Sequence, residues 1–173
     1  MVSCLRKFTF GLVLLAFCLP SWTATKPTIV VLGDSLSTAY GMAADQGWVS
    51  LLQQRVRDQG FPHRVVNASI SGDTTRGGLQ RVVSILVRHT PAIVIVELGG
   101  NDGLRGLSLA DIQANLTAIV RRVQQHGAKV LLVGMRLPPN YGARYVEQFS
   151  EIYPQISRDF NTGLVPFMLD GLE

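Results

Sequence analysis

Apolar positions along the chain follow two kinds of pattern. Short, uninterrupted apolar runs rich in β-branched residues are typical of strands buried on both faces, whereas apolar residues three or four positions apart indicate amphipathic helices. The runs predict strands at 28–32, 65–66, 93–98, 130–133 and 164–167. The spaced patterns predict helices at 48–59, 79–88, 108–126 and 145–160, the last with a kink at Pro154.

Strands that alternate with helices predict an α/β domain built from βαβ units. We expect a three-layer α/β/α arrangement around a parallel five-stranded sheet, with the flavodoxin-like strand order 2-1-3-4-5. The length of 173 residues suits one domain with a sizeable core. Neither a linker nor an internal repeat interrupts the pattern over 25–173, so we expect a single domain there.

The N-terminal residues follow a different pattern from the rest. Two basic residues precede an uncharged apolar run over 8–19, and small and polar residues then lead to Ala24. This order is typical of a secretory signal peptide, and the run is shorter than the roughly 20 residues that span a bilayer. We expect residues 1–24 to be cleaved on export to a bacterial periplasm or medium, leaving no stable membrane anchor. An uncleaved anchor is the alternative.

Composition narrows the class of protein further. An apolar content of 47% with 16% charged residues argues against a disordered chain. Both cysteines, Cys4 and Cys18, lie in the N-terminal segment, so residues 25–173 need no disulfide and offer no thiol nucleophile. The net charge of +4 includes two charges from that segment. Because no basic cluster with interleaved aromatic residues is present, we expect no nucleic-acid binding.

Glycine and polar residues follow three of the predicted strands. They are Gly-Asp-Ser-Leu at 33–36, Asn-Ala-Ser-Ile-Ser-Gly-Asp at 67–73 and Gly-Gly-Asn-Asp-Gly at 99–103. Ligands bind at the carboxyl ends of such strands, where the order 2-1-3 would set Ser35 between Gly72 and Asn101. An acyl-transfer site needs a hydroxyl nucleophile and donors aimed at the developing oxyanion. Ser35 is the candidate nucleophile, with the N–H groups of Ser35 and Gly72 and the Asn101 amide as candidate donors.

These segments resemble the GDSL, or SGNH, hydrolases. Gly-Asp-Ser-Leu, Ser-Gly-Asp at 71–73 and Gly-Gly-Asn-Asp at 99–102 are similar to that family's first three blocks. Longer stretches at 67–74, 96–106 and 135–142 resemble its periplasmic thioesterase, protease and lysophospholipase group, which includes arylesterases. The resemblance runs from about Thr28 to about Asp170.

The resemblance implies hydrolysis of small acyl esters and thioesters without a cofactor or metal. It implies that Ser35 is the nucleophile and that Gly72 and Asn101 complete the oxyanion hole. By the same resemblance, substrate-binding positions are Asp34, Leu36, Asp73, Gly100, Leu104, Arg105, Leu137 and Pro138. Leu104, Leu137 and Pro138 are expected to line an acyl channel.

One part of the family pattern does not occur in residues 1–173. The resemblance implies a histidine base in a late Asp-x-x-His block, but His63 precedes the second strand and His89 and His126 end helices. Glu173 stands three positions after Asp170, yet Asp170 matches a loop that comes before that block. We therefore expect the catalytic Asp and His and the family's final helix to be missing, and this chain alone to be inactive.

Two other functions are compatible with the sequence. A non-catalytic acyl- or lipid-binding protein would keep the pocket without the base. A flavodoxin-like nucleotide or phosphate binder is a weaker alternative, because no phosphate-binding glycine pattern opens any predicted helix. The acidic residues Asp73, Glu97 and Asp102 have no histidine beside them in sequence, so we expect no metal site.

Overall fold

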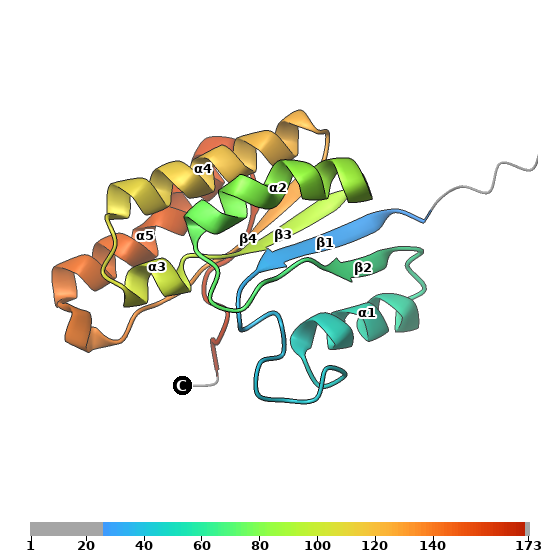
Figure 1. Cartoon of the computed structure of the whole chain (residues 1–173), viewed down its shortest axis with the longest axis horizontal. Coiled ribbons are helices and arrows are strands. Elements are labelled where there is room, and N and C mark those ends of the chain that lie inside the picture. Colours follow the sequence, from blue (N-terminus) through green and yellow to red (C-terminus); the bar gives the residue numbers. More distant parts are fainter. Residues whose placement is uncertain (1–25, 172–173) are drawn as a thin grey trace, which may run out of the picture.

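The computed structural model describes residues 26–171 (Figure 1). The signal peptide expected at 1–24 and Glu173 lie outside these residues. The strands are β1 (Thr28–Gly33), β2 (Arg64–Asn67), β3 (Ile93–Glu97), β4 (Lys129–Val133) and β5 (Gly163–Val165). The helices are α1 (Trp48–Asp58), α2 (Thr75–His89), α3 (Gly100–Leu104), α4 (Leu109–Gln125) and α5 (Ala143–Phe160), with a 3-10 turn at Pro139–Tyr141.

The five strands form one parallel sheet in the order β2-β1-β3-β4-β5, which confirms the predicted fold and strand order. Helices α2, α4 and α5 cover one face of the sheet, and α1 covers part of the other (Figure 1). The larger core lies under the three helices and includes Val30, Leu32 and Val96. Ile29, Val31 and Ile95 face α1 instead. Because consecutive strand residues point to opposite faces, burial on both sides explains the uninterrupted apolar runs.

The position of β1 between β2 and β3 sets the place of the site. All six residues of β1 are buried, and its neighbours on either side are β2 and β3. Gly33 at the end of β1 is in register with Glu97 at the end of β3, while Val31 is in register with Asn67 at the end of β2. The residues that follow these three strands therefore leave the sheet at the same edge.

Two helices differ from the sequence prediction. Helix α2 begins at Thr75, four residues earlier than predicted, because the Thr74 hydroxyl caps it by accepting a hydrogen bond from the Gly77 N–H at 3.2 Å. Its first turn contains Gly77 and Gly78, which lower helix propensity and hid the start. The short helix α3 was not predicted, since its first residues read as a glycine turn.

The C-terminal elements follow the prediction with small shifts. Ser108 caps α4 as predicted, its hydroxyl accepting from the Asp111 N–H at 3.4 Å. Helix α5 runs as one element from Ala143 through Pro154 to Phe160, and β5 is shorter than predicted. Within residues 26–171, no helix is both long enough and apolar enough to cross a membrane.

Candidate active site

The chain turns sharply after β1 and places Ser35 at the carboxyl edge of the sheet. Asp34 is buried, Ser35 is half-buried and Leu36 is exposed. The Asp34 side chain holds this turn, because its Oδ1 accepts a hydrogen bond from the Leu36 N–H at 3.0 Å. The Asp34 carbonyl oxygen accepts a second bond from the Ser37 N–H at 3.2 Å. Ser35 is thus partly open to solvent on a turn with a fixed backbone.

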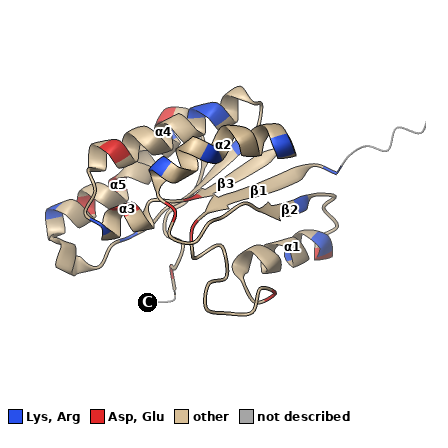
Figure 2. Ribbon diagram, in the orientation of Figure 1, with Lys and Arg blue, Asp and Glu red and all other residues tan. Residues whose placement is uncertain are grey.

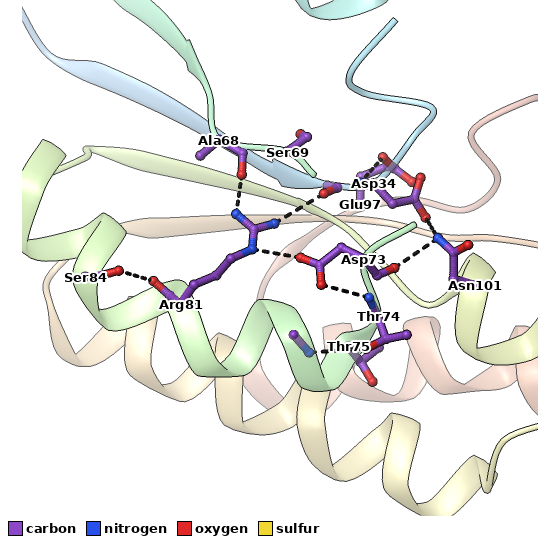
Figure 3. A network of polar contacts seen from close by, with 12 residues as sticks. Asp34, Ala68, Ser69, Asp73, Thr74, Thr75, Arg81, Ser84, Glu97 and Asn101 are labelled. Atoms are coloured by element: carbon purple, nitrogen blue, oxygen red, sulfur yellow. Dashed lines mark hydrogen bonds and ion pairs between the residues drawn. The ribbon is translucent and has the colours of Figure 1, made fainter. Parts of the chain in front are cut away.

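Asn101 joins the three polar segments that the sequence placed at successive strand ends. It lies in α3, and its Nδ2 donates to Asp34 Oδ2 at 2.9 Å and to the Asp73 carbonyl oxygen at 2.9 Å (Figure 3). Asp34 immediately precedes Ser35, and Asp73 immediately follows Gly72. The structure therefore gathers the segments of Ser35, Gly72 and Asn101. Because both amide protons are donated within the protein, one of these bonds must be exchanged for Asn101 to contact an oxyanion.

Gly72 adopts a backbone conformation that favours glycine. Its φ is +77°, in the left-handed region, and a Cβ at this position would meet no atom within 4 Å. Glycine is therefore required here by the backbone angle and not by crowding. The Gly72 carbonyl oxygen accepts a hydrogen bond from Arg105 Nη2 at 3.2 Å. Arg105, a predicted substrate-binding residue, thus holds the loop that carries Gly72.

Arg81 on α2 ties the same segments together, and sequence reasoning missed it. Its Nε pairs with Asp73 Oδ2 at 2.7 Å, its Nη2 donates to the Gly33 carbonyl oxygen at 3.3 Å, and its Nη1 donates to the Ala68 carbonyl oxygen (Figure 3). One guanidinium thus links the end of β1, the loop after β2 and the start of α2. Two of its three acceptors are main-chain carbonyl groups, which no sequence pattern marks.

Glu97 was considered in sequence only as a metal ligand, but it supports the turn that carries Ser35. It ends β3 with 0% of its surface exposed. Its Oε2 accepts hydrogen bonds from the Ser37 hydroxyl at 2.5 Å and from the Asp34 N–H at 3.2 Å. Burial, followed by the charge of Asp34, raises the pKa of Glu97 to about 8. An acidic residue at the end of an apolar strand run was the signal available in sequence.

Hydrogen bonds between Asp102 and Thr75 attach α3 to the start of α2. Asp102 is buried, and its two carboxyl oxygens accept hydrogen bonds from the Thr75 hydroxyl at 2.6 Å and from the Thr75 N–H at 2.9 Å. Just before α3, the Tyr153 hydroxyl donates to the Leu98 carbonyl oxygen at 2.9 Å. These contacts fix the short helix that carries Asn101. Figure 2 shows acidic residues gathered at the carboxyl edge of the sheet and basic residues on α1, α2 and α4.

The predicted acyl-channel residues lie in different environments. Leu104 and Pro138 are exposed, whereas Leu137 is buried in the larger core. A Cβ on Gly103 would lie 2.7 Å from a Leu137 methyl group, so Leu137 packs directly beneath α3. Gly100, another predicted substrate contact, is half-buried at the start of α3. An acyl channel formed by these residues stays a prediction.

The histidines of the described chain lie far from Ser35. His63 directly precedes β2, His89 ends α2 just before β3, and His126 follows α4 just before β4. All three therefore lie at the amino-terminal edge of the parallel sheet, whereas Ser35 follows the carboxyl end of β1. Six residues of β1 separate these edges by roughly 20 Å. Among residues 26–171, no histidine is within hydrogen-bonding reach of the Ser35 hydroxyl.

Comparison with known proteins agrees with this geometry. The model of the GDSL-like lipase/acylhydrolase family matches residues 31–172, which include all three polar segments. The chain belongs to this family. This match confirms the resemblance seen in the sequence. It also confirms the prediction that the chain is a hydrolase.

Similar proteins of this family carry esterase and thioesterase names. The chain is 51% identical over 158 residues to the esterase TesA of Pseudomonas aeruginosa, covering 91% of this chain and 79% of that protein. It is 45% identical over 147 residues to the thioesterase 1/protease 1/lysophospholipase L1 of Escherichia coli K12, covering 85% and 69%. Its fold matches the crystal structure of AlinE4, an SGNH-hydrolase family esterase, with a TM-score of 0.82 at 41% identity, over 86% and 80% of the two chains.

Proposed function

We propose that the chain cleaves small carboxylic esters and thioesters through an acyl-enzyme formed on Ser35. The double contact of Asn101 with Asp34 and with the Asp73 carbonyl group carries this proposal, because it gathers a nucleophile and candidate oxyanion donors at one edge. The esterase and thioesterase names of similar proteins support the substrate class. No step of this chemistry calls for a cofactor.

In the proposed reaction, Ser35 Oγ attacks the carbonyl carbon of the substrate and gives its proton to a general base. The carbonyl oxygen becomes an oxyanion, which the N–H groups of Ser35 and Gly72 and the Asn101 amide stabilise. Collapse of this intermediate breaks the C–O or C–S bond, and the leaving alcohol or thiol takes up the proton. Water then attacks the acyl-enzyme in the same manner, releasing the acid and restoring Ser35.

The general base is the part of the proposal that the histidines among residues 26–171 do not supply. In the family the base is a histidine of the Asp-x-x-His block, and the histidines between 26 and 171 lie at the opposite edge of the sheet. A neutral serine is a poor nucleophile. We therefore propose that residues 25–173 alone turn over little or no ester. The same observation favours a second candidate, a non-catalytic protein that binds acyl groups.

We also propose export to the periplasm or medium, because residues 1–24 have the three-part order of a secretory signal. N-terminal sequencing of protein from the periplasm is expected to give a start between about Ser21 and Lys26. Protein that still begins at Met1 and stays in the inner membrane would contradict this.

Trapping of the acyl-enzyme tests the proposed function. Residues 25–173, extended by a homologous segment with the Asp-x-x-His block, are mixed with a short-chain aryl ester, quenched in acid and digested. Mass spectrometry is expected to find the acyl group on the peptide with Ser35 and to lose it in Ser35→Ala. Ser71→Ala, which removes an exposed serine of a neighbouring segment, is the matched control. Ester binding without any adduct favours the acyl-binding protein, and hydrolysis by Ser35→Ala overturns the proposal.

A further inference from the structure

The two carboxyl oxygens of Glu97 have very different surroundings. Oε2 accepts hydrogen bonds from the Ser37 hydroxyl and the Asp34 N–H. Oε1 is equally buried, yet it meets no hydrogen-bond donor among the described residues. A buried carboxylate with one oxygen lacking donors is costly, because removal from water disfavours the charged form. A proton on Oε1 removes that cost.

Asp34 provides the acceptor for such a proton. The Asp34 N–H donates to Glu97 Oε2, and the negative charge of the Asp34 side chain raises the pKa of Glu97, second to burial (Figure 3). Burial raises the pKa of Asp34 as well, but Asp34 accepts hydrogen bonds from the Leu36 N–H and from Asn101 Nδ2, and both oppose that shift by favouring its ionised form. When two carboxyl groups lie this close, one proton is retained between them. We assign this proton to Glu97, because Glu97 is fully buried and its Oε1 has no hydrogen-bond donor among the described residues.

The backbone leaves room for this pair. A Cβ on Gly33 would lie 2.6 Å from Glu97 Oε2 and 2.5 Å from the Ser37 hydroxyl oxygen. Any side chain at position 33 would therefore push the carboxyl group away from the nucleophile turn. Gly33, in the first family block, thus leaves room for the Glu97 carboxyl group beside the turn.

We propose that Glu97 is a neutral carboxylic acid at neutral pH, and that its Oε1–H, donated to Asp34, positions Asn101 and the Ser35 turn. Glu97 touches no reacting atom and acts through Asp34 and Ser37, so it is a positioning residue. Its importance for catalysis rests on the proposed function, whereas the position of its proton does not.

The charged and titratable groups around Glu97 explain what its ionisation would do. Asp34 faces it from the end of β1, and Tyr153 faces it from α5 with its hydroxyl bonded to Leu98. Asp73 acts on Asp34 and is paired with Arg81. No cation described here contacts the Glu97 carboxyl group. Ionisation of Glu97 therefore places a second negative charge beside Asp34 and weakens the geometry that holds Asn101.

Infrared spectroscopy of the full chain with ¹³C-labelled glutamate carboxyl groups tests the position of the proton. Glu147 and Glu151 are exposed, and Glu97→Gln assigns the signal of Glu97. We expect a carboxylic-acid C=O band at neutral pH that disappears with a pKa of about 8 and is absent in Glu97→Gln. A spectrum with every glutamate ionised at neutral pH overturns the inference.

The NMR resonance of the Asn101 side-chain amide tests the positioning role. In the wild-type chain it is expected to shift as Glu97 ionises. In Glu97→Gln, which keeps an acceptor for Ser37 and a donor for Asp34 but never ionises, it is expected to stay constant. Glu147→Gln, an exposed substitution on α5, serves as the control and should behave as the wild type. The same pH dependence in Glu97→Gln overturns the positioning role.

These outcomes separate the inference from the proposed function. An acid band in a chain that forms no acyl-enzyme, even when extended, refutes the proposed function and leaves the proton on Glu97. An acyl-enzyme on Ser35 in a chain without the acid band refutes the inference alone.

Discussion

Asn101 connects the proposed chemistry with the residues that support it. Its Nδ2 donates to Asp34 and to the Asp73 carbonyl oxygen, which holds the side chain at the strand ends, and one of these bonds is exchanged when Asn101 contacts the oxyanion. Oxyanion-hole donors act mainly in the transition state. In the extended chain, we expect Asn101→Ala to lower kcat by about 10²–10³ with little change in KM. An unchanged kcat for an aryl ester would remove Asn101 from the oxyanion hole.

Glu97 makes stability depend on pH. Its pKa of about 8 in the folded chain exceeds the ordinary value of 4.5, so the folded state binds the proton more tightly than the unfolded state. This contribution is complete below the ordinary pKa and is lost as pH rises through about 8. We expect the Tm of the wild-type chain to fall relative to that of Glu97→Gln across this range. Thermal melts at a series of pH values measure it, and parallel curves would contradict it.

At the scale of elements, α2 is attached to the sheet edge by Arg81. Arg81→Ala removes three contacts and leaves the half-buried Asp73 carboxylate without its cation. Loss of a hydrogen bond to a charged group costs about 1.5–3 kcal/mol, so we expect the free energy of unfolding to fall by at least that amount. Denaturant unfolding measures it. Arg76→Ala, which removes an exposed arginine from the same helix, is the control, and equal effects of the two substitutions would count against the account.

The elements show which parts of the fold the sequence could predict. Strands β1 and β3 were clear because both faces are buried, and the parallel sheet followed from alternation with helices, whereas the strand order was taken from the flavodoxin-like fold. The start of α2 was hidden by Gly78, whose Cα faces Leu98, since a Cβ there would lie 2.3 Å from a Leu98 methyl group. This close packing involves a residue far away in sequence, and local propensity does not reveal it.

Within the site too, local motifs could be read from the sequence, whereas contacts between distant segments could not. Ser35, Gly72 and Asn101 could be proposed as site residues because each follows a predicted strand in a known motif. The contacts of Arg81 with main-chain carbonyl groups, and of Asn101 with Asp34, depend on segments far apart in sequence. Such partners have no local signal, so they became visible in the folded chain.

At the scale of the whole molecule, the sheet face on the α1 side carries an apolar groove of about 270 Å³. Its lining consists of Trp48, Leu52, Ile95, Leu131, Val133, Val165 and Met168. Parallel sheets are normally covered on both faces. At about 25 cal/mol per Å², covering several hundred Å² contributes several kcal/mol. We expect residues 25–173 to melt well below the version with a homologous C-terminal segment, and equal Tm values would contradict this.

Ester turnover tests the central claim, that Ser35 is a nucleophile whose base lies outside residues 25–173. Initial rates on a short-chain aryl ester are compared for residues 25–173, the version extended with the Asp-x-x-His block, and its Ser35→Ala variant. Loss of the histidine alone costs about 10⁶ in kcat in an unrelated serine protease. We predict that the extended protein turns over the ester. We expect residues 25–173 and the Ser35→Ala variant to lose kcat to a comparable extent. If residues 25–173 turn over as fast as the extended form, the base lies among them and the claim is wrong.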